Sequence, residues 1–360
     1  MNNRTRIALA AIAVILSTAT FFGYRKWGVQ KNSTRFDVLA AMPAKASAVL
    51  FADLGEFRQA PFVAQIYALA QKPQVEPEYA QFVKETGFDY EKDLDRIAIA
   101  ISKNAIHNTF LAVVNGRFDQ ERISDYALQH GKSYLTENNR RVFFMPSDDG
   151  SKSLSFVFVR KDLLVITNDA FSPEELHDVL HSDAGRTEWR TRFERLAGSP
   201  VFAVIKQNAA LGTTLAARTP NGLRSPQLST LLDQLQWITI AGKPDNDRLR
   251  VVAEGECAGE ATVRQLTDMM NGVLILAESG LNDAKTRQQL DPAIREAYLE
   301  LLKSADVSKI DRGDSKSVRL VFDITPGFLE AASKAPPAMP RPAPSQPLPR
   351  KAPASRKGRT

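Results

Sequence analysis

Short segments in which large apolar residues alternate with other residues recur along the middle of this chain, and they constrain its fold more than any other feature. Clear examples are Arg96–Ser102 (RIAIAIS), Thr109–Phe118 (TFLAVVNGRF) and Lys316–Ile324 (KSVRLVFDI). A period of two gives a strand one apolar face, which is typical of antiparallel sheets. Amphipathic helical segments lie between the strands, for example from Asp119 to a predicted end at Gly131. The sequence therefore predicts an α+β protein of mostly antiparallel sheet with helices on one face.

The order of the predicted elements is similar in two parts of the chain. Each part reads strand, helix, strand, strand, helix, strand, although the two share almost no identical residues. An order that returns in this way indicates an internal repeat, so we expect two similar α+β subdomains, 36–185 and 186–333. The matched strands are Ser47–Leu54 with Pro200–Lys206, Arg96–Ser102 with Gln236–Gly242, and Thr109–Phe118 with Arg248–Cys257.

An apolar run at residues 7–24 contains no charged side chain. As a helix it would be about 27 Å long, close to the ~30 Å hydrocarbon thickness of a bilayer. Basic residues lie on both sides of the run, and Tyr24 and Trp27 provide the aromatic groups expected at a membrane interface. The sequence predicts that residues 1–35 form an N-terminal transmembrane helix with basic flanks.

Two other interpretations of this run remain open. A cleaved signal peptide would use Ser17-Thr18-Ala19 as its small-residue site, and a buried core helix would span no membrane. Apolar character continues through Phe21 and Phe22, beyond that site, which favours an uncleaved anchor. The flanking charges are nearly balanced and do not decide the orientation. Because a short N-terminal tail is easily retained inside, we expect a single-pass protein of the inner or cytoplasmic membrane with a periplasmic or extracellular body.

The formal net charge of +6 is unevenly distributed over the 360 residues. Thirteen of the 47 bases lie in residues 1–35 and 334–360, which contain no acid, so residues 36–333 hold 34 bases against 41 acids. Binding to nucleic acid through a folded domain needs a dense basic surface. The acidic body makes nucleic acid an unlikely partner for it.

Residues 334–360 combine eight prolines with seven bases and little apolar bulk. This composition predicts a disordered, extended tail. Its charge suits an anionic envelope polymer, a lipid headgroup or an acidic protein, and a solubilising spacer without a ligand is the alternative.

One set of residues has the spacing of a metal site. His177 and His181 lie one helical turn apart, with Glu174 on the same side, and this arrangement can hold a divalent ion. Only two further histidines exist in the chain, and the solvated margin of an amphipathic helix explains the same spacing. Glu174, His177 and His181 are therefore the candidate metal ligands, and no cofactor is predicted.

Other signatures of catalysis are missing. The five acids of Glu85–Asp95 do not form a calcium loop, because Leu94 and not glycine follows Asp93 and no bidentate glutamate stands at the proper distance. Capping of a short turn is the simpler role for Asp89. Cys257 lies among glutamates, which disfavour its thiolate. Neither a nucleophile elbow nor a glycine-rich phosphate loop occurs. These observations favour a protein that is not an enzyme.

Two segments, Pro43–Phe62 and Glu85–Ile101, resemble uncharacterised membrane-anchored bacterial envelope proteins of unknown function. In those proteins a Pro-Ala-x-Ala entry leads into a strand and a short helix, and a Gly-Phe-Asp-acidic stretch precedes a second strand. The resemblance implies an envelope protein and carries no catalytic residues.

The leading hypothesis is a membrane-anchored, extracytoplasmic binding or scaffolding module of the bacterial envelope. One alternative is an envelope hydrolase with a dispersed or metal-dependent site. The other is a cytoplasm-facing protein whose basic tail binds nucleic acid.

The anchor hypothesis can be tested by deletion. Removing residues 1–35 should move the protein from the carbonate-washed membrane pellet to the soluble fraction, because the apolar run that binds the bilayer is lost. A control chain without residues 335–360 should stay in the pellet. Retention of the first variant in the washed membranes would contradict the prediction.

Overall fold

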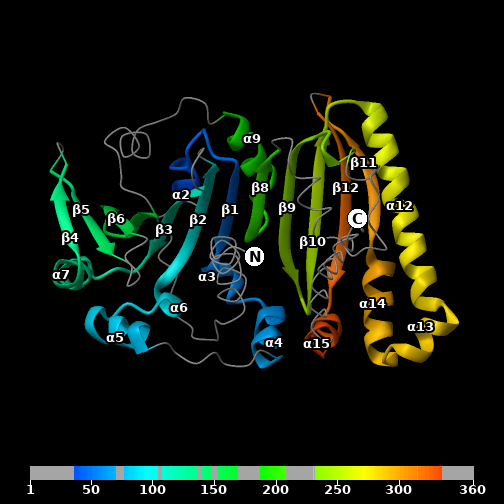
Figure 1. Ribbon diagram of the computed structural model, residues 1–360, viewed down its shortest axis with the longest axis horizontal. Coiled ribbons are helices and arrows are strands. Elements are labelled where there is room, and N and C mark those ends of the chain that lie inside the picture. Colours follow the sequence, from blue (N-terminus) through cyan, green and yellow to red (C-terminus); the bar gives the residue numbers. More distant parts are fainter. Residues whose placement is uncertain are drawn as a thin grey trace, which may run out of the picture.

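The computed structural model describes residues 36–69, 77–103, 108–136, 139–146, 153–168, 187–207, 230, 232–313 and 315–334. These residues form one twelve-stranded sheet accompanied by helices (Figure 1). The strand order is β11-β12-β10-β9-β8-β1-β2-β3-β7-β6-β5-β4, and every neighbouring pair is antiparallel. The predicted mixture of helices with a mainly antiparallel sheet is confirmed.

The first part of the chain supplies seven strands and six helices among the described residues. The strands are β1 (Ala48–Asp53), β2 (Leu94–Lys103), β3 (Asn108–Gly116), β4 (Lys132–Leu135), β5 (Arg141–Pro146), β6 (Ser153–Arg160) and β7 (Leu163–Thr167). The helices are α2 (Phe36–Ala40), α3 (Leu54–Phe57), α4 (Pro61–Leu69), α5 (Pro77–Thr86), α6 (Tyr90–Asp93) and α7 (Gln120–His130).

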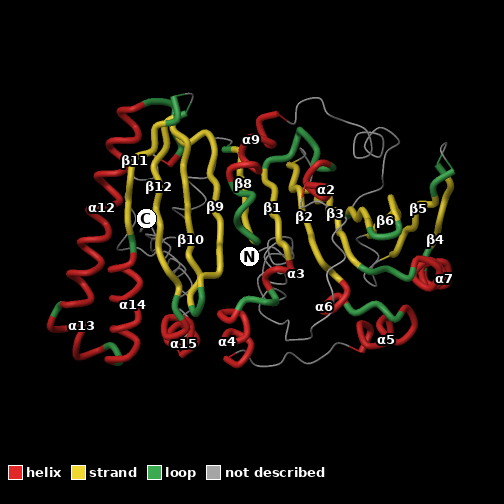
Figure 2. Tube along the Cα trace, turned by 180° about the vertical axis from the view of Figure 1, so that it is seen from behind, coloured by secondary structure: helices red, strands yellow, loops and turns green. Residues whose placement is uncertain are grey.

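The second part supplies the remaining described elements, at the β11 end of the sheet. The strands are β8 (Val201–Lys206), β9 (Leu235–Asp245), β10 (Arg248–Cys257), β11 (Asp306–Asp311) and β12 (Lys316–Ile324). The helices are α9 (Thr187–Arg195), α12 (Glu260–Asn282), α13 (Ala284–Gln289), α14 (Pro292–Ser304) and α15 (Pro326–Lys334). Seen from behind, in Figure 2, the strands run in one row from the α12–α14 end to the α7 end.

The two parts of the chain meet where β1 pairs with β8. In this register Phe51 lies opposite Phe202, and their rings stack with centroids 4.9 Å apart. Outward from this junction the order is β1-β2-β3-β7 on one side and β8-β9-β10-β12 on the other. The strands that were matched in the predicted repeat thus occupy corresponding places in one continuous sheet. The division into two subdomains stays a prediction.

Helices pack on both faces of the sheet, so the prediction of a single covered face was wrong. On β2, Ala98 and Ala100 belong to the core cluster that contains α2 and α9. Ile97 and Ile99 point the other way and pack with the cluster that contains α7. The alternation in this strand is between small apolar residues that are buried and large apolar residues that are partly buried.

Several elements differ in extent from their prediction. The helix expected after the first strand is divided into α3 and α4, with Arg58-Gln59-Ala60 between them and Pro61 beginning the second helix. The α7 helix begins and ends as predicted, because the Asp119 side chain accepts a hydrogen bond from the backbone N–H of Arg122 and Gly131 is the C-cap. The terminal strands β4 and β11 were not predicted.

The predicted anchor at residues 7–24 lies outside the described residues, as does the tail from residue 335 onward. Within the described part of the chain, no helix is both long enough and apolar enough to cross a membrane.

Truncating one side chain at the β1–β8 junction should strongly destabilise the folded protein. Phe51→Ala should lower the free energy of unfolding by about 3–5 kcal/mol, because it removes a fully buried ring and leaves a cavity between the two parts of the sheet. Urea unfolding monitored by tryptophan fluorescence measures this loss. Ile240→Ala is the control, because Ile240 on β9 is 41% exposed and should cost far less. Equal losses in the two variants would contradict a shared core at the junction.

Candidate functional site

Two glutamates of β10 are buried charged residues that lie close together in the strand. Glu254 and Glu256 are two positions apart, so they point to the same face of the sheet. Their side chains are only 9% and 5% exposed. An ionised carboxylate buried in this way costs several kcal/mol unless it is paired and hydrogen-bonded. Their partners therefore define the site.

Glu254 binds two arginines from the β11–β12 end of the sheet. Arg312 donates from both terminal nitrogens, with Nη2 2.7 Å from Oε2, and Arg319 Nη2 lies 3.2 Å from the same oxygen. Burial raises the pKa of Glu254, but the hydrogen bonds of Arg312 and Arg319 together with the charge of Arg312 outweigh burial and hold the pKa below its ordinary value of 4.5. Glu254 is therefore ionised at neutral pH.

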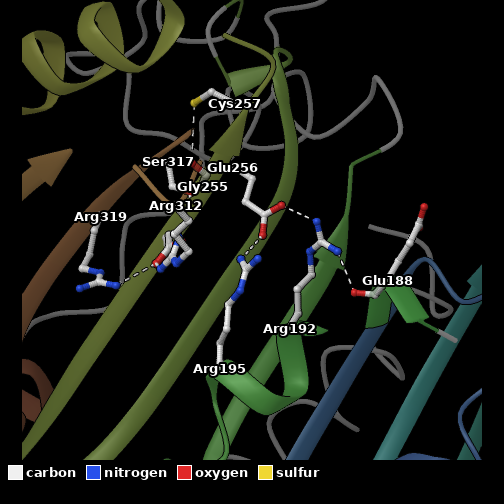
Figure 3. Close-up of polar contacts among 10 residues, drawn as sticks. Glu188, Arg192, Arg195, Gly255, Glu256, Cys257, Arg312, Ser317 and Arg319 are labelled. Carbon is white, nitrogen blue, oxygen red and sulfur yellow. Dashed lines mark hydrogen bonds and ion pairs between the residues drawn. The ribbon is translucent and has the colours of Figure 1, made fainter. Parts of the chain in front are cut away.

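Glu256 binds two arginines from α9 (Figure 3). Arg195 Nη1 is 2.9 Å from Oε1, and Arg192 Nη2 donates to Oε2. The Arg192 guanidinium also lies over the Trp237 ring, 3.8 Å from its centroid, and donates to the Glu188 carbonyl oxygen at 2.7 Å. A cation against an aromatic face is stabilised when water is excluded.

The positions of the arginines follow from the helix and the strands that carry them. On α9, Trp189 and Phe193 are one turn apart and buried, so one face of the helix packs into the core. Arg192 and Arg195 extend from it toward β10. Arg319 is the direct cross-strand neighbour of Glu254 in the β10–β12 register. We call the two glutamates together with the four arginines the Glu–Arg cluster: Glu254, Glu256, Arg192, Arg195, Arg312 and Arg319.

Glu254 and the four arginines of the cluster are poor groups for proton transfer. Arginine keeps its proton at every physiological pH, and Glu254 is held as a carboxylate. Cys257 points to the opposite face of β10, where burial raises the pKa of its thiol to about 11. At neutral pH this thiol is protonated, so it is a poor nucleophile.

The predicted metal ligands Glu174, His177 and His181 lie outside the described residues. Across the part of the chain that the structure describes, no group of three or more His, Cys, Asp or Glu side chains is arranged to hold a metal ion.

The acids of Glu85–Asp95 have structural partners. Asp89 caps α6, since its Oδ1 accepts a hydrogen bond from the Glu91 backbone N–H at 2.9 Å, as the sequence indicated. Asp95 pairs with Arg117 at 3.3 Å. Asp89 and Asp95 therefore have structural roles, the first in helix capping and the second in an ion pair.

Sequence reasoning did not find the Glu–Arg cluster. The two glutamates stand in the segment EGEC, where they indicated only an unreactive cysteine. The spacing of the two glutamates could have revealed the cluster, because charges at positions i and i+2 of an interior strand share one face and must be paired. The arginines come from α9, from the β11–β12 connection and from β12, so no local motif joins them.

Comparison with known proteins gives no family. No protein-family model matches the chain, and no curated protein matches it. Among solved structures, crystal form III of TP0453 is similar with 12% identity and a TM-score of 0.45, over 84% of this chain and 98% of that one. Crystal form IV of TP0453 gives 11% identity and a TM-score of 0.43, over 82% and 96%. We draw no functional argument from likeness at this level.

The paired state of Glu254 predicts a pH-dependent contribution to stability. Glu254→Gln should lower the free energy of unfolding by about 2–4 kcal/mol at pH 7, because Arg312 and Arg319 lose a buried charged partner. The pKa of Glu254 is lower in the folded state than in the unfolded state. Its contribution is therefore complete above the unfolded pKa and disappears as the pH falls through the folded pKa.

Urea unfolding of the two proteins between pH 7 and pH 3 measures this contribution. The difference between wild type and Glu254→Gln should shrink over the acidic part of that range. Glu296→Gln is the control, since the Glu296 side chain is 68% exposed and should contribute little. A difference that does not change with pH would show that the carboxylate charge is unimportant.

Proposed function

We propose that this protein is a membrane-anchored, extracytoplasmic binding or scaffolding module of the bacterial envelope. The Glu–Arg cluster is the observation that carries the binding role. It holds four permanent cations around two ion-paired carboxylates, and its arginines keep their protons at neutral pH. Such a set of residues recognises charge and shape and does not transform a substrate.

The sheet supports the same role. All twelve strands are joined by backbone hydrogen bonds, and core clusters lie on both of its faces. Such an element resists deformation and holds surface groups at fixed separations. A module that presents a binding surface, or that holds partners apart, requires this rigidity.

The proposed location rests on the sequence. The apolar run at residues 7–24 provides the anchor, and the acidic body stands between two basic ends. In this proposal residues 334–360 contact an anionic envelope polymer, lipid headgroup or acidic protein, because their seven bases are opposed by no acid.

Protease accessibility tests the location directly. With an epitope tag at the C-terminus of the full chain, external protease should digest the body in intact spheroplasts, because the body lies outside the cytoplasmic membrane. A cytoplasmic marker in the same sample should stay intact until the spheroplasts are lysed. Protection of the body until lysis would place it in the cytoplasm and overturn the proposal.

A further inference from the structure

The Glu–Arg cluster contains more positive than negative charge. Four guanidinium groups carry four positive charges, while Glu254 and Glu256 supply at most two negative ones. Each carboxylate binds two arginines, so these six side chains together carry an excess of two positive charges. The charge is unusual in a body that holds 34 bases against 41 acids over residues 36–333.

Some donors of the cluster are also unused. The Nε atoms of Arg192 and Arg319 are buried and have no hydrogen-bond partner within the described residues. Arg195 donates only from Nη1, to Glu256, within the same part of the chain. Arginine has five N–H donors, and buried donors without acceptors are costly. The buried Nε atoms are out of reach of a ligand, but Arg195 is partly exposed and has donors left, so the cluster has both charge and hydrogen-bonding capacity for another anion.

Three of the arginines are also reachable. The side chains of Arg195, Arg312 and Arg319 are 24%, 25% and 33% exposed, whereas the Arg192 side chain is 11% exposed and lies against Trp237. Arg312 also donates to Ser317, which lies directly opposite Glu256 across the β10–β12 pair. Figure 3 shows Arg319, Arg312 and Arg195 following one another across this side of the sheet.

From these contacts we propose that the Glu–Arg cluster binds a phosphate group, held chiefly by Arg195 and Arg319 with Arg312 between them. The two glutamates orient the guanidinium groups, and the dianionic phosphate supplies the two missing negative charges. This inference rests on the binding role proposed above and adds the chemical class of the ligand.

Phosphate suits the arrangement better than other ligands. A metal ion is excluded by the positive excess, and a single carboxylate would leave one charge uncompensated. Guanidinium groups bind phosphate oxygens through paired N–H donors, and such charge-assisted hydrogen bonds are about twice as strong as neutral ones. Free phosphate and the phosphomonoester headgroup of phosphatidic acid share this chemistry, so the experiment must distinguish them.

The test uses the full-length chain in detergent and the double variant Arg195→Gln/Arg319→Gln. Each glutamate keeps one arginine in this variant, Arg192 for Glu256 and Arg312 for Glu254, so the fold should be retained. The control is Arg250→Gln, because Arg250 lies on the same face of β10 and pairs with Asp323 at 3.0 Å outside the cluster. Circular dichroism and unfolding curves confirm that the three proteins are folded.

Calorimetric titration with inorganic phosphate at constant ionic strength is the first arm. Wild type and Arg250→Gln should bind with the same saturable affinity, and the double variant should bind at least about tenfold more weakly, since two charge-assisted contacts are lost. The second arm measures co-sedimentation with vesicles of phosphatidylcholine that contain phosphatidic acid and with vesicles of phosphatidylcholine alone.

Each outcome of the phosphate titration and of the vesicle co-sedimentation either supports or overturns the inference. Saturable phosphate binding that the double variant loses supports the inference with free phosphate as ligand. Binding only to the vesicles that contain phosphatidic acid, lost in the double variant alone, supports it with a lipid headgroup as ligand. Absence of binding in both arms, or equal binding by all three proteins, overturns it. Since the spheroplast experiment does not involve these arginines, a failure here leaves the proposed location intact and removes only the ligand.

Discussion

The backbone pairing of β1 with β8 holds the described part of the molecule together. Without it the two parts of the chain would each expose a strand edge in the middle of the protein. Residues from both parts then share one core, in which Phe51 meets Phe202 and Trp189 donates to the Ala44 carbonyl oxygen at 3.3 Å. The α9 helix takes its place over this shared core. The Glu–Arg cluster depends on that placement, because two of its arginines belong to α9.

Much of the fold could be predicted from the sequence, because local patterns determine it. The period-two segments became strands, and Asp119 and Gly131 ended up as the caps of α7. Which faces of the sheet are covered by helices could not be predicted in the same way. Ala98 and Ala100 count as apolar whether they are buried or exposed, and only the position of α2 shows that they are buried. The short edge strand β4, with four exposed residues, has no apolar face to reveal it.

The cluster was beyond prediction for a different reason. Its members are separated by up to 127 positions, from Arg192 to Arg319, and a single sequence contains no sign that they meet. What the sequence does contain is the constraint on Glu254 and Glu256, since charges inside a sheet need partners. The net charge of residues 36–333 gave no sign of the site either. An acidic body conceals a local positive excess, because the average over the chain says nothing of a group of six side chains.

The alternation along β2 imposes opposite size limits on the two sides of a single strand. Where Ala98 and Ala100 face α2, a larger side chain would push the helix away, so that side has an upper limit on volume. Where Ile97 and Ile99 face the α7 cluster, a smaller side chain would leave a void, so that side has a lower limit. Neighbouring residues of β2 should therefore tolerate opposite kinds of substitution during evolution.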